Sequence, residues 1–224
     1  MNAVSLTAGV NSSFPTTNGW TGIVNNSSGE TGSFLVAVAC ANRPPHYSVV
    51  SSKPVNTPSP HRTTVTVSCP KSAKPLGGGS QSNGSTSVYL GASRPFQNGW
   101  RITEENSTAT LATRVIEPGP TVKAFVVCGT VPGYRLLTGK ARAVLPLSQA
   151  MLTANCPSGS VIIGGGAGVN TSNLGVNLNM TGPIDPTAEA VLNGPRPPFG
   201  WNTIVNNNNE VAATASPFAI CAGG

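Results

Sequence analysis

One sequence pattern occurs three times in this chain, and the repetition constrains the fold more than any other feature. In each occurrence a Gly-Trp dipeptide precedes a polar segment and then a strand-like run that ends in cysteine. The three sets are Gly19-Trp20 with Cys40, Gly99-Trp100 with Cys128, and Gly200-Trp201 with Cys221. The cysteines of these sets are 88 and 93 residues apart, and another two, Cys69 and Cys156, are 87 apart. A shared period indicates an internal repeat in which each copy is one structural unit.

A complete copy contains Cys-Pro, a Gly-Gly-Gly triplet, the Gly-Trp dipeptide and a final cysteine, in that order. The two triplets are Gly77, Gly78 and Gly79, and Gly164, Gly165 and Gly166. The first copy begins midway, because nothing before Val4 matches Cys69-Pro70 or a triplet. We predict one repeat-built protein over residues 1–224, with an incomplete first copy at 1–40, a second at 41–128 and a third at 129–224. An insertion at residues 183–198 delays the third Gly-Trp and is expected to form a surface loop.

Turn-forming residues are abundant and charges are scarce, which favours an all-β protein. The chain has 26 Gly and 20 Pro, and charged residues make up 9%, against roughly 25% in an average soluble domain. Short runs rich in β-branched residues are bounded by turn residues, at 34–38, 63–67, 86–90, 122–127, 161–163 and 211–215. Pro146 interrupts the helix-like composition of residues 140–155, so we expect loop and strand there. The predicted fold is a pseudo-threefold internal repeat of antiparallel β-sheets, prism-, sandwich- or barrel-like, with little or no helix.

The chain has five cysteines, and two pairings fit the repeat equally well. One joins Cys40 to Cys69 and Cys128 to Cys156 and leaves Cys221 as a free thiol; the other joins Cys69 to Cys128 and Cys156 to Cys221 and leaves Cys40 free. We favour the first pairing because its loops are shorter and nearly equal in length. Disulfides imply an oxidising final environment.

The recurring residues are interpreted as scaffold. A tryptophan beside amide side chains can stack on a sugar ring. A repeated tryptophan is more simply the large apolar side chain that each copy buries, and this is the role we assign to Trp20, Trp100 and Trp201. The glycine triplets lack the Lys-Ser/Thr and the helix that a phosphate-binding loop needs, so bulges or close backbone approach explain them better.

No catalytic, cofactor-binding or metal-binding residues are predicted. Glu104-Glu105 is the one adjacent acidic pair, Asp185 is the only Asp, and no nucleophile and base recur together. A zinc set is conceivable, and its four members would be Cys40, His46, His61 and Cys69. The segment between Cys128 and Cys156 contains no histidine, which argues against a zinc site that the fold requires.

The net charge of +6 comes from basic residues spread along the chain, not from a basic stripe, so we expect no nucleic-acid partner. The sequence contains no apolar run of the roughly 18 residues that span a membrane, and no basic and apolar leader follows Met1. We therefore expect neither membrane insertion nor a signal peptide.

The order of these motifs resembles repeat modules found in secreted and phage-encoded proteins of actinobacteria. The matching elements are Cys69-Pro70, the first glycine triplet, Ser93-Arg94-Pro95, Gly99-Trp100 and Cys128-Gly129, followed by Cys156-Pro157, the second triplet, Gly200-Trp201 and Cys221-Ala222. The resemblance covers nearly the whole chain, but its motifs are structural and carry no catalytic residues. The half copy directly after Met1 departs from a trimmed secreted precursor and leads us to expect a complete translation product.

These features favour a non-enzymatic structural protein of a phage virion, either a capsid decoration protein or a tail-associated protein that binds the host surface. Its partners would be other virion proteins or a host glycan, with a possible trimer or placement on a threefold site. The alternative is a secreted or cell-wall-associated carbohydrate-binding module. Any specific binding surface is expected in the segments that do not repeat, chiefly 44–61 and 183–198.

Overall fold

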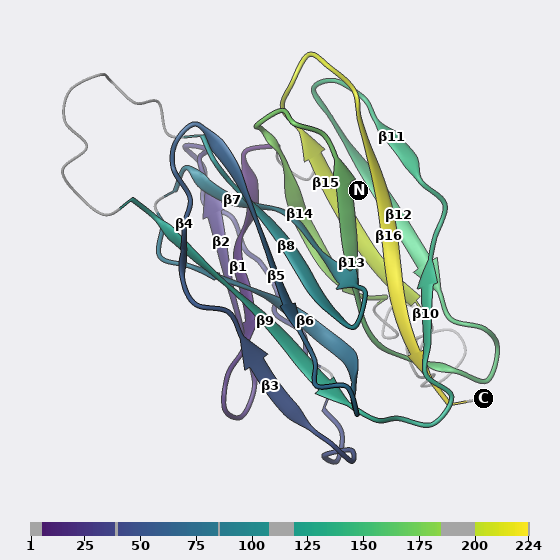
Figure 1. Ribbon diagram of the computed structural model, residues 1–224. Coiled ribbons are helices and arrows are strands. Elements are labelled where there is room, and N and C mark those ends of the chain that lie inside the picture. The colour runs from purple at the N-terminus through teal and green to yellow at the C-terminus, as the bar shows by residue number, and fades with distance from the viewer. Residues whose placement is uncertain (1–5, 39, 85, 108–118, 185–199, 224) are drawn as a thin grey trace.

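The computed structural model describes residues 6–38, 40–84, 86–107, 119–184 and 200–223, and among these it contains sixteen strands and no helix (Figure 1). The strands are β1 (Ala8–Pro15), β2 (Trp20–Asn26), β3 (Ser48–Ser51), β4 (Val55–Asn56), β5 (His61–Ser68), β6 (Lys74–Ser82), β7 (Val88–Phe96), β8 (Gly99–Asn106), β9 (Thr121–Gly129), β10 (Arg135–Thr138), β11 (Arg142–Val144), β12 (Ser148–Asn155), β13 (Val161–Asn170), β14 (Val176–Pro183), β15 (Gly200–Asn207) and β16 (Ala213–Ala222). The all-β prediction is confirmed, and residues 140–155 form β11 and β12, as expected.

The strands form three antiparallel sheets, which we call A, B and C. Sheet A has the order β2-β1-β6-β9-β3, with β4 also pairing with β9. Sheet B has the order β10-β16-β13-β7-β8-β5, with β11 also pairing with β16. Sheet C contains β12-β15-β14. The described strands therefore make three open sheets of six, seven and three strands.

The strand pairings of the two longer copies are the same. In the second copy, β3, β4 and β6 all pair with β9. In the third copy, β10, β11 and β13 pair with β16 in the same way. The remaining three strands of each copy also correspond, since β5-β8-β7 has the order of β12-β15-β14. Each copy is thus divided between two sheets, and sheets A and B each combine strands from two copies.

The disulfides join Cys69 to Cys128 and Cys156 to Cys221, with Cα separations of 5.7 and 5.8 Å. The pairing that we favoured was wrong, and the exposed free cysteine is Cys40, not Cys221. Cys69 directly follows β5 in sheet B, whereas Cys128 lies on β9 in sheet A. Each disulfide therefore links the two sheets that one copy occupies, and strand placement, not loop length, decides the pairing.

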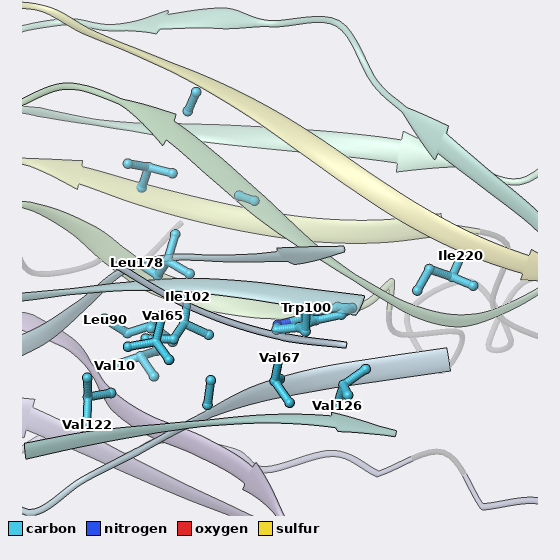
Figure 2. Packing of buried hydrophobic residues seen from close by; sticks show 14 of the residues in the cluster. Val10, Val65, Val67, Leu90, Trp100, Ile102, Val122, Val126, Leu178 and Ile220 are labelled. Carbon is cyan, nitrogen blue, oxygen red and sulfur yellow. The ribbon is translucent and has the colours of Figure 1, made fainter. Parts of the chain in front are cut away.

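The hydrophobic core lies between the sheets and is continuous across copies (Figure 2). Val10, Leu90 and Leu178, from β1, β7 and β14, contribute to one cluster. In β9, side chains alternate between the core and the surface, as a strand with one face on the core requires. The core-facing members Val122, Ala124, Val126 and Cys128 are fully buried.

The strand predicted at residues 34–38 is not formed. The structure leaves this segment without ladder pairing, and Phe34, Val36 and Val38 are 60%, 42% and 53% exposed. The local sequence favours a strand, but a strand needs a neighbour for its backbone groups. The described residues provide no such neighbour for this segment.

Candidate functional site

Three hairpins carry the same tryptophan arrangement. They are β1-β2, β7-β8 and β14-β15, and each has a register shift at the same place, directly after Val10, Leu90 and Leu178. In each hairpin the indole Nε1 donates a hydrogen bond of 2.8 Å to a hydroxyl on the partner strand. The acceptors of Trp20, Trp100 and Trp201 are Ser13 Oγ, Ser93 Oγ and Thr181 Oγ1. Each indole is therefore anchored by its own hairpin.

The glycine triplets provide the surfaces on which two of these indoles lie. A Cβ atom at Gly78 would overlap the indole of Trp100, and one at Gly165 would overlap the indole of Trp201. The next glycine of each triplet meets the neighbouring strand, since a Cβ at Gly79 would overlap the backbone of Ser13. Both triplets also follow a register shift in the strand. Close approach of a side chain and a backbone thus explains why glycine stands there.

An apolar groove of about 410 Å³ lies beside the first hairpin. It is lined by β1 and β2, by residues 33–38, by Gly77 and Gly78, by residues 162–165 of β13, by residues 179–183 of β14, and by Ser93, Trp201 and Ile204. Trp20 and Trp201 are half-buried there, whereas Trp100 is fully buried. The groove therefore brings together residues from both ends of the sequence.

None of the described residues that line the groove is charged, and several of its polar side chains already have partners. Ser13, Ser93 and Thr181 accept the three indole hydrogen bonds, and Asn179 Nδ2 donates to the backbone oxygen of Ala8 at 2.8 Å. The exposed apolar residues of segment 34–38 form one wall. This chemistry suits an apolar, uncharged ligand or a polypeptide backbone.

A pair of carboxyl groups lies in the core of the second copy. Glu104 and Glu105 of β8 are both fully buried. The guanidinium of Arg62 contacts Glu105 Oε2 at 3.0 Å, and Asn177 donates to Glu105 Oε1 at 3.3 Å. Burial raises the pKa of Glu105, and the positive charge of Arg62 counteracts part of this effect. The contacts of Glu105 thus join β5 and β8 of one copy to β14 of the next.

Glu104 has a weaker set of partners. Ser82 Oγ donates to its Oε1 at 3.0 Å, while Oε2 is buried without a hydrogen bond to the described residues. Burial raises the pKa of Glu104 to about 8, an effect larger than the lowering by the nearby hydroxyls of Ser82 and Thr57. Glu104 is enclosed by the core, whereas Glu105, although fully buried, borders a second pocket that Tyr89 and Asn177 help to line.

The stability of the protein should fall as the pH rises because of Glu104. Its pKa is about 8 in the folded state and 4.5 without the fold, so the folded state binds a proton that the unfolded state releases. This contribution is complete below the lower value and is lost as the pH rises toward the upper one, with a slope of at most about 1.4 kcal/mol per unit. We expect Glu104→Gln to reduce the pH dependence of the free energy of unfolding, measured with urea, between these values. A smaller dependence of the same sign remains because burial also raises the pKa of Glu105. The same change at exposed Glu210 serves as the control, and equal slopes for both variants would contradict the assignment.

The zinc set considered from the sequence is not available as a set of ligands. The sulfur of Cys69 is bonded to Cys128, and His46 and His61 are exposed. Among the described residues no group of three or more His, Cys, Asp or Glu side chains could hold a metal ion. Nor does that part of the chain include a helix with the length and apolar character to cross a bilayer.

The predicted binding segments are placed only in part. Segment 44–61 contributes β3 and β4, which lie on β9. Residues 183 and 184 are described, and Pro183 lines the groove, but 185–198 and Asp185 within it lie outside the described residues.

The sequence analysis predicted neither the groove nor the burial of Glu104. A signal for the latter was present, because Val24 and Val205 occupy its position in the other hairpins.

No family model matches the chain, and no curated protein matches it either.

Proposed function

We propose that the chain is a non-enzymatic structural protein of a phage virion, either a capsid decoration protein or a tail-associated protein. The observation that carries this proposal is the uncharged groove with an exposed apolar wall at residues 34–38. Contiguous apolar surface of this kind is typical of a contact with another macromolecule. The enclosed position of Glu104 and the ion pair of Glu105 with Arg62 favour a structural role over a catalytic one.

The same proposal includes a pseudo-threefold, prism-like arrangement of the copies. β1, β7 and β14, which hold corresponding positions in the three hairpins, contact one another pairwise. At one point a Cβ on Gly9 would meet both Tyr89 and Asn177, the residues at the matching positions of the other two hairpins. An arrangement with this internal symmetry suits a threefold or quasi-threefold site of a particle.

The two disulfides are typical of proteins that work in an oxidising environment. A virion that is released by lysis is exposed to such conditions, and so is a secreted protein. The disulfides therefore support a position outside the reducing cytosol, and the exposed groove is what favours assembly into a particle.

A carbohydrate-binding module is the second candidate, because Trp20 and Trp201 are half-buried in the groove and could stack on a sugar ring. A sugar also needs hydrogen-bonding groups for its hydroxyls. The engaged hydroxyls of the groove supply few, which places this candidate behind the first.

Mass spectrometry of density-purified virions and of cell-free supernatant tests the proposal. We expect the chain in the particle fraction at a fixed ratio to a capsid or tail protein, and absent from particle-free supernatant. A chain found only in the supernatant would refute the virion role. Glycan-array binding that is lost on Trp20→Ala would then establish the carbohydrate-binding alternative.

A further inference from the structure

The first copy contains a hairpin and a cysteine-ending segment, but the described residues provide no counterpart of β6 or β13 for it. In the second copy β6 lies between β1 of the preceding copy and β9 of its own. In the third copy β13 lies between β7 and β16 in the same way. By this rule the next strand position lies between β14, at the edge of sheet C, and residues 34–38, and both line the groove.

Segment 34–38 has the side-chain pattern of a strand whose neighbour is not in place. Counted back from the final cysteine, Phe34 corresponds to Val122 and Val38 to Val126. Val122 and Val126 are 0% exposed, whereas Phe34 and Val38 are 60% and 53% exposed. Phe34 and Val38 therefore mark the side of this segment that would face the core if the neighbouring strand were present.

Cys40 gives a second, independent indication. It corresponds to Cys128 and Cys221, whose partners Cys69 and Cys156 each precede a glycine triplet by eight residues. Cys40 is exposed and has a free thiol. The residue that would pair with it belongs to the same segment as the strand that would fill the groove.

We propose that the groove binds a β-strand donated by a partner polypeptide that carries cysteine, seven further residues and a Gly-Gly-Gly triplet. The strand runs antiparallel to β14 and to residues 34–38, as β6 does to β1 and β9. Its central glycine lies against the indole of Trp20, as Gly78 lies against Trp100. Its cysteine forms a disulfide with Cys40. The partner therefore completes the first copy.

The disulfide forms by exchange and needs no separate oxidant when the partner cysteine is held as a mixed disulfide with a small thiol. The thiolate of Cys40 attacks the partner's sulfur, the bond between that sulfur and the small thiol breaks, and the small thiol leaves as a thiolate. One disulfide is consumed and one is formed. The side-chain thiol proton of Cys40 goes to water before the attack.

A polypeptide strand fits the groove better than other ligands do. β14 has one edge without a strand neighbour among the described residues, and segment 34–38 has no ladder pairing, so backbone groups are what the groove offers. The space beside Trp20 admits a glycine backbone, by analogy with Trp100. The inference rests on the proposed structural function, for which it names the partner class.

The test uses the full chain and a fluorescent synthetic peptide of residues 70–84, which contains the triplet of β6. We expect saturable binding by fluorescence anisotropy and slowed amide hydrogen exchange in residues 33–38 and β14. A control peptide with Gly78→Val should bind about tenfold more weakly or worse, because a Cβ there would overlap the indole. Equal binding of the two peptides, or none, would overturn the proposal.

Covalent capture tests the role of Cys40. A peptide of residues 69–82, with its cysteine as a mixed disulfide with thionitrobenzoate, should label Cys40 and release the coloured thiolate. The Gly78→Val peptide should react about tenfold more slowly, since it lacks the effective concentration that docking provides. Equal rates would show that Cys40 is merely an exposed thiol, and Cys40→Ser should abolish labelling.

Two further outcomes separate this proposal from the others. Concentration-dependent dimers in sedimentation that the peptide does not dissociate would assign the groove to a second copy of the chain, against the proposal. Failure of peptide binding together with a fixed amount of chain in virions would remove the donated strand but leave the structural function intact. If the chain binds the peptide but is found only in supernatant, the donated strand is retained and the virion function is refuted.

Discussion

Replacing Trp100 by alanine should lower the free energy of unfolding by about 3–5 kcal/mol, the largest effect of any single substitution proposed for this protein. The indole is fully buried, lies against Gly78 between sheets A and B, and donates a hydrogen bond to Ser93. Its removal loses apolar contacts, leaves a cavity and orphans a buried hydroxyl. Urea unfolding followed by circular dichroism measures the change without depending on tryptophan fluorescence.

The matched control is Trp20→Ala. Trp20 makes the same hydrogen bond, to Ser13, but it is only half-buried at the groove. Folding removes less apolar surface of Trp20 than of Trp100 from water. We therefore expect Trp20→Ala to lower the free energy of unfolding by about half as much as Trp100→Ala, or less. Equal losses for the two variants would show that the hydrogen bond, common to both, is the stabilising element and that the difference in burial has no energetic consequence.

Gly78→Ala should destabilise the protein by about 2–3 kcal/mol, the second-largest effect, although it adds a single methyl group. The new Cβ would overlap the Trp100 indole and approach the backbone oxygen of Phe125, and neither can move without disturbing a sheet. Chemical denaturation and the heat-unfolding midpoint both measure this loss.

Gly77→Ala provides the control for the substitution, because nothing lies within 4 Å of a Cβ built at Gly77. Alanine also restricts the unfolded chain more than glycine does, so this variant should be within about 1 kcal/mol of the parent protein. A large loss at Gly77 together with a small one at Gly78 would mean that conformational freedom, and not close packing on the indole, explains the triplet.

The all-β class was the part of the fold most accessible from the sequence. Five of the six β-branched runs bounded by turn residues overlap strands, namely β5, β7, β9, β13 and β16. The disulfides were not predicted correctly, because chain separation does not reveal that β5 and β9 belong to different sheets.

Local pattern failed where distant residues decide the outcome. Segment 34–38 has the composition of a strand, yet it lacks a ladder partner among the described residues. Nothing in the local sequence around Glu104-Glu105 indicates burial, yet the fold places Arg62 and Asn177 against Glu105 from other strands. The groove could not be found from sequence alone for the same reason, since Trp20 and Met180 come together only through the sheets.

Because the second and third copies are each divided between two sheets, the unit of repetition differs from the unit of folding. Sheet B holds β7, β8 and β5 from one copy and β13, β16 and β10 from the next, so no cut between copies leaves both fragments with intact sheets (Figure 1). A further copy would extend this arrangement by pairing with a sheet edge such as that of β14. Each added copy would then share a sheet with the copy before it, as the second copy shares sheet A with the first.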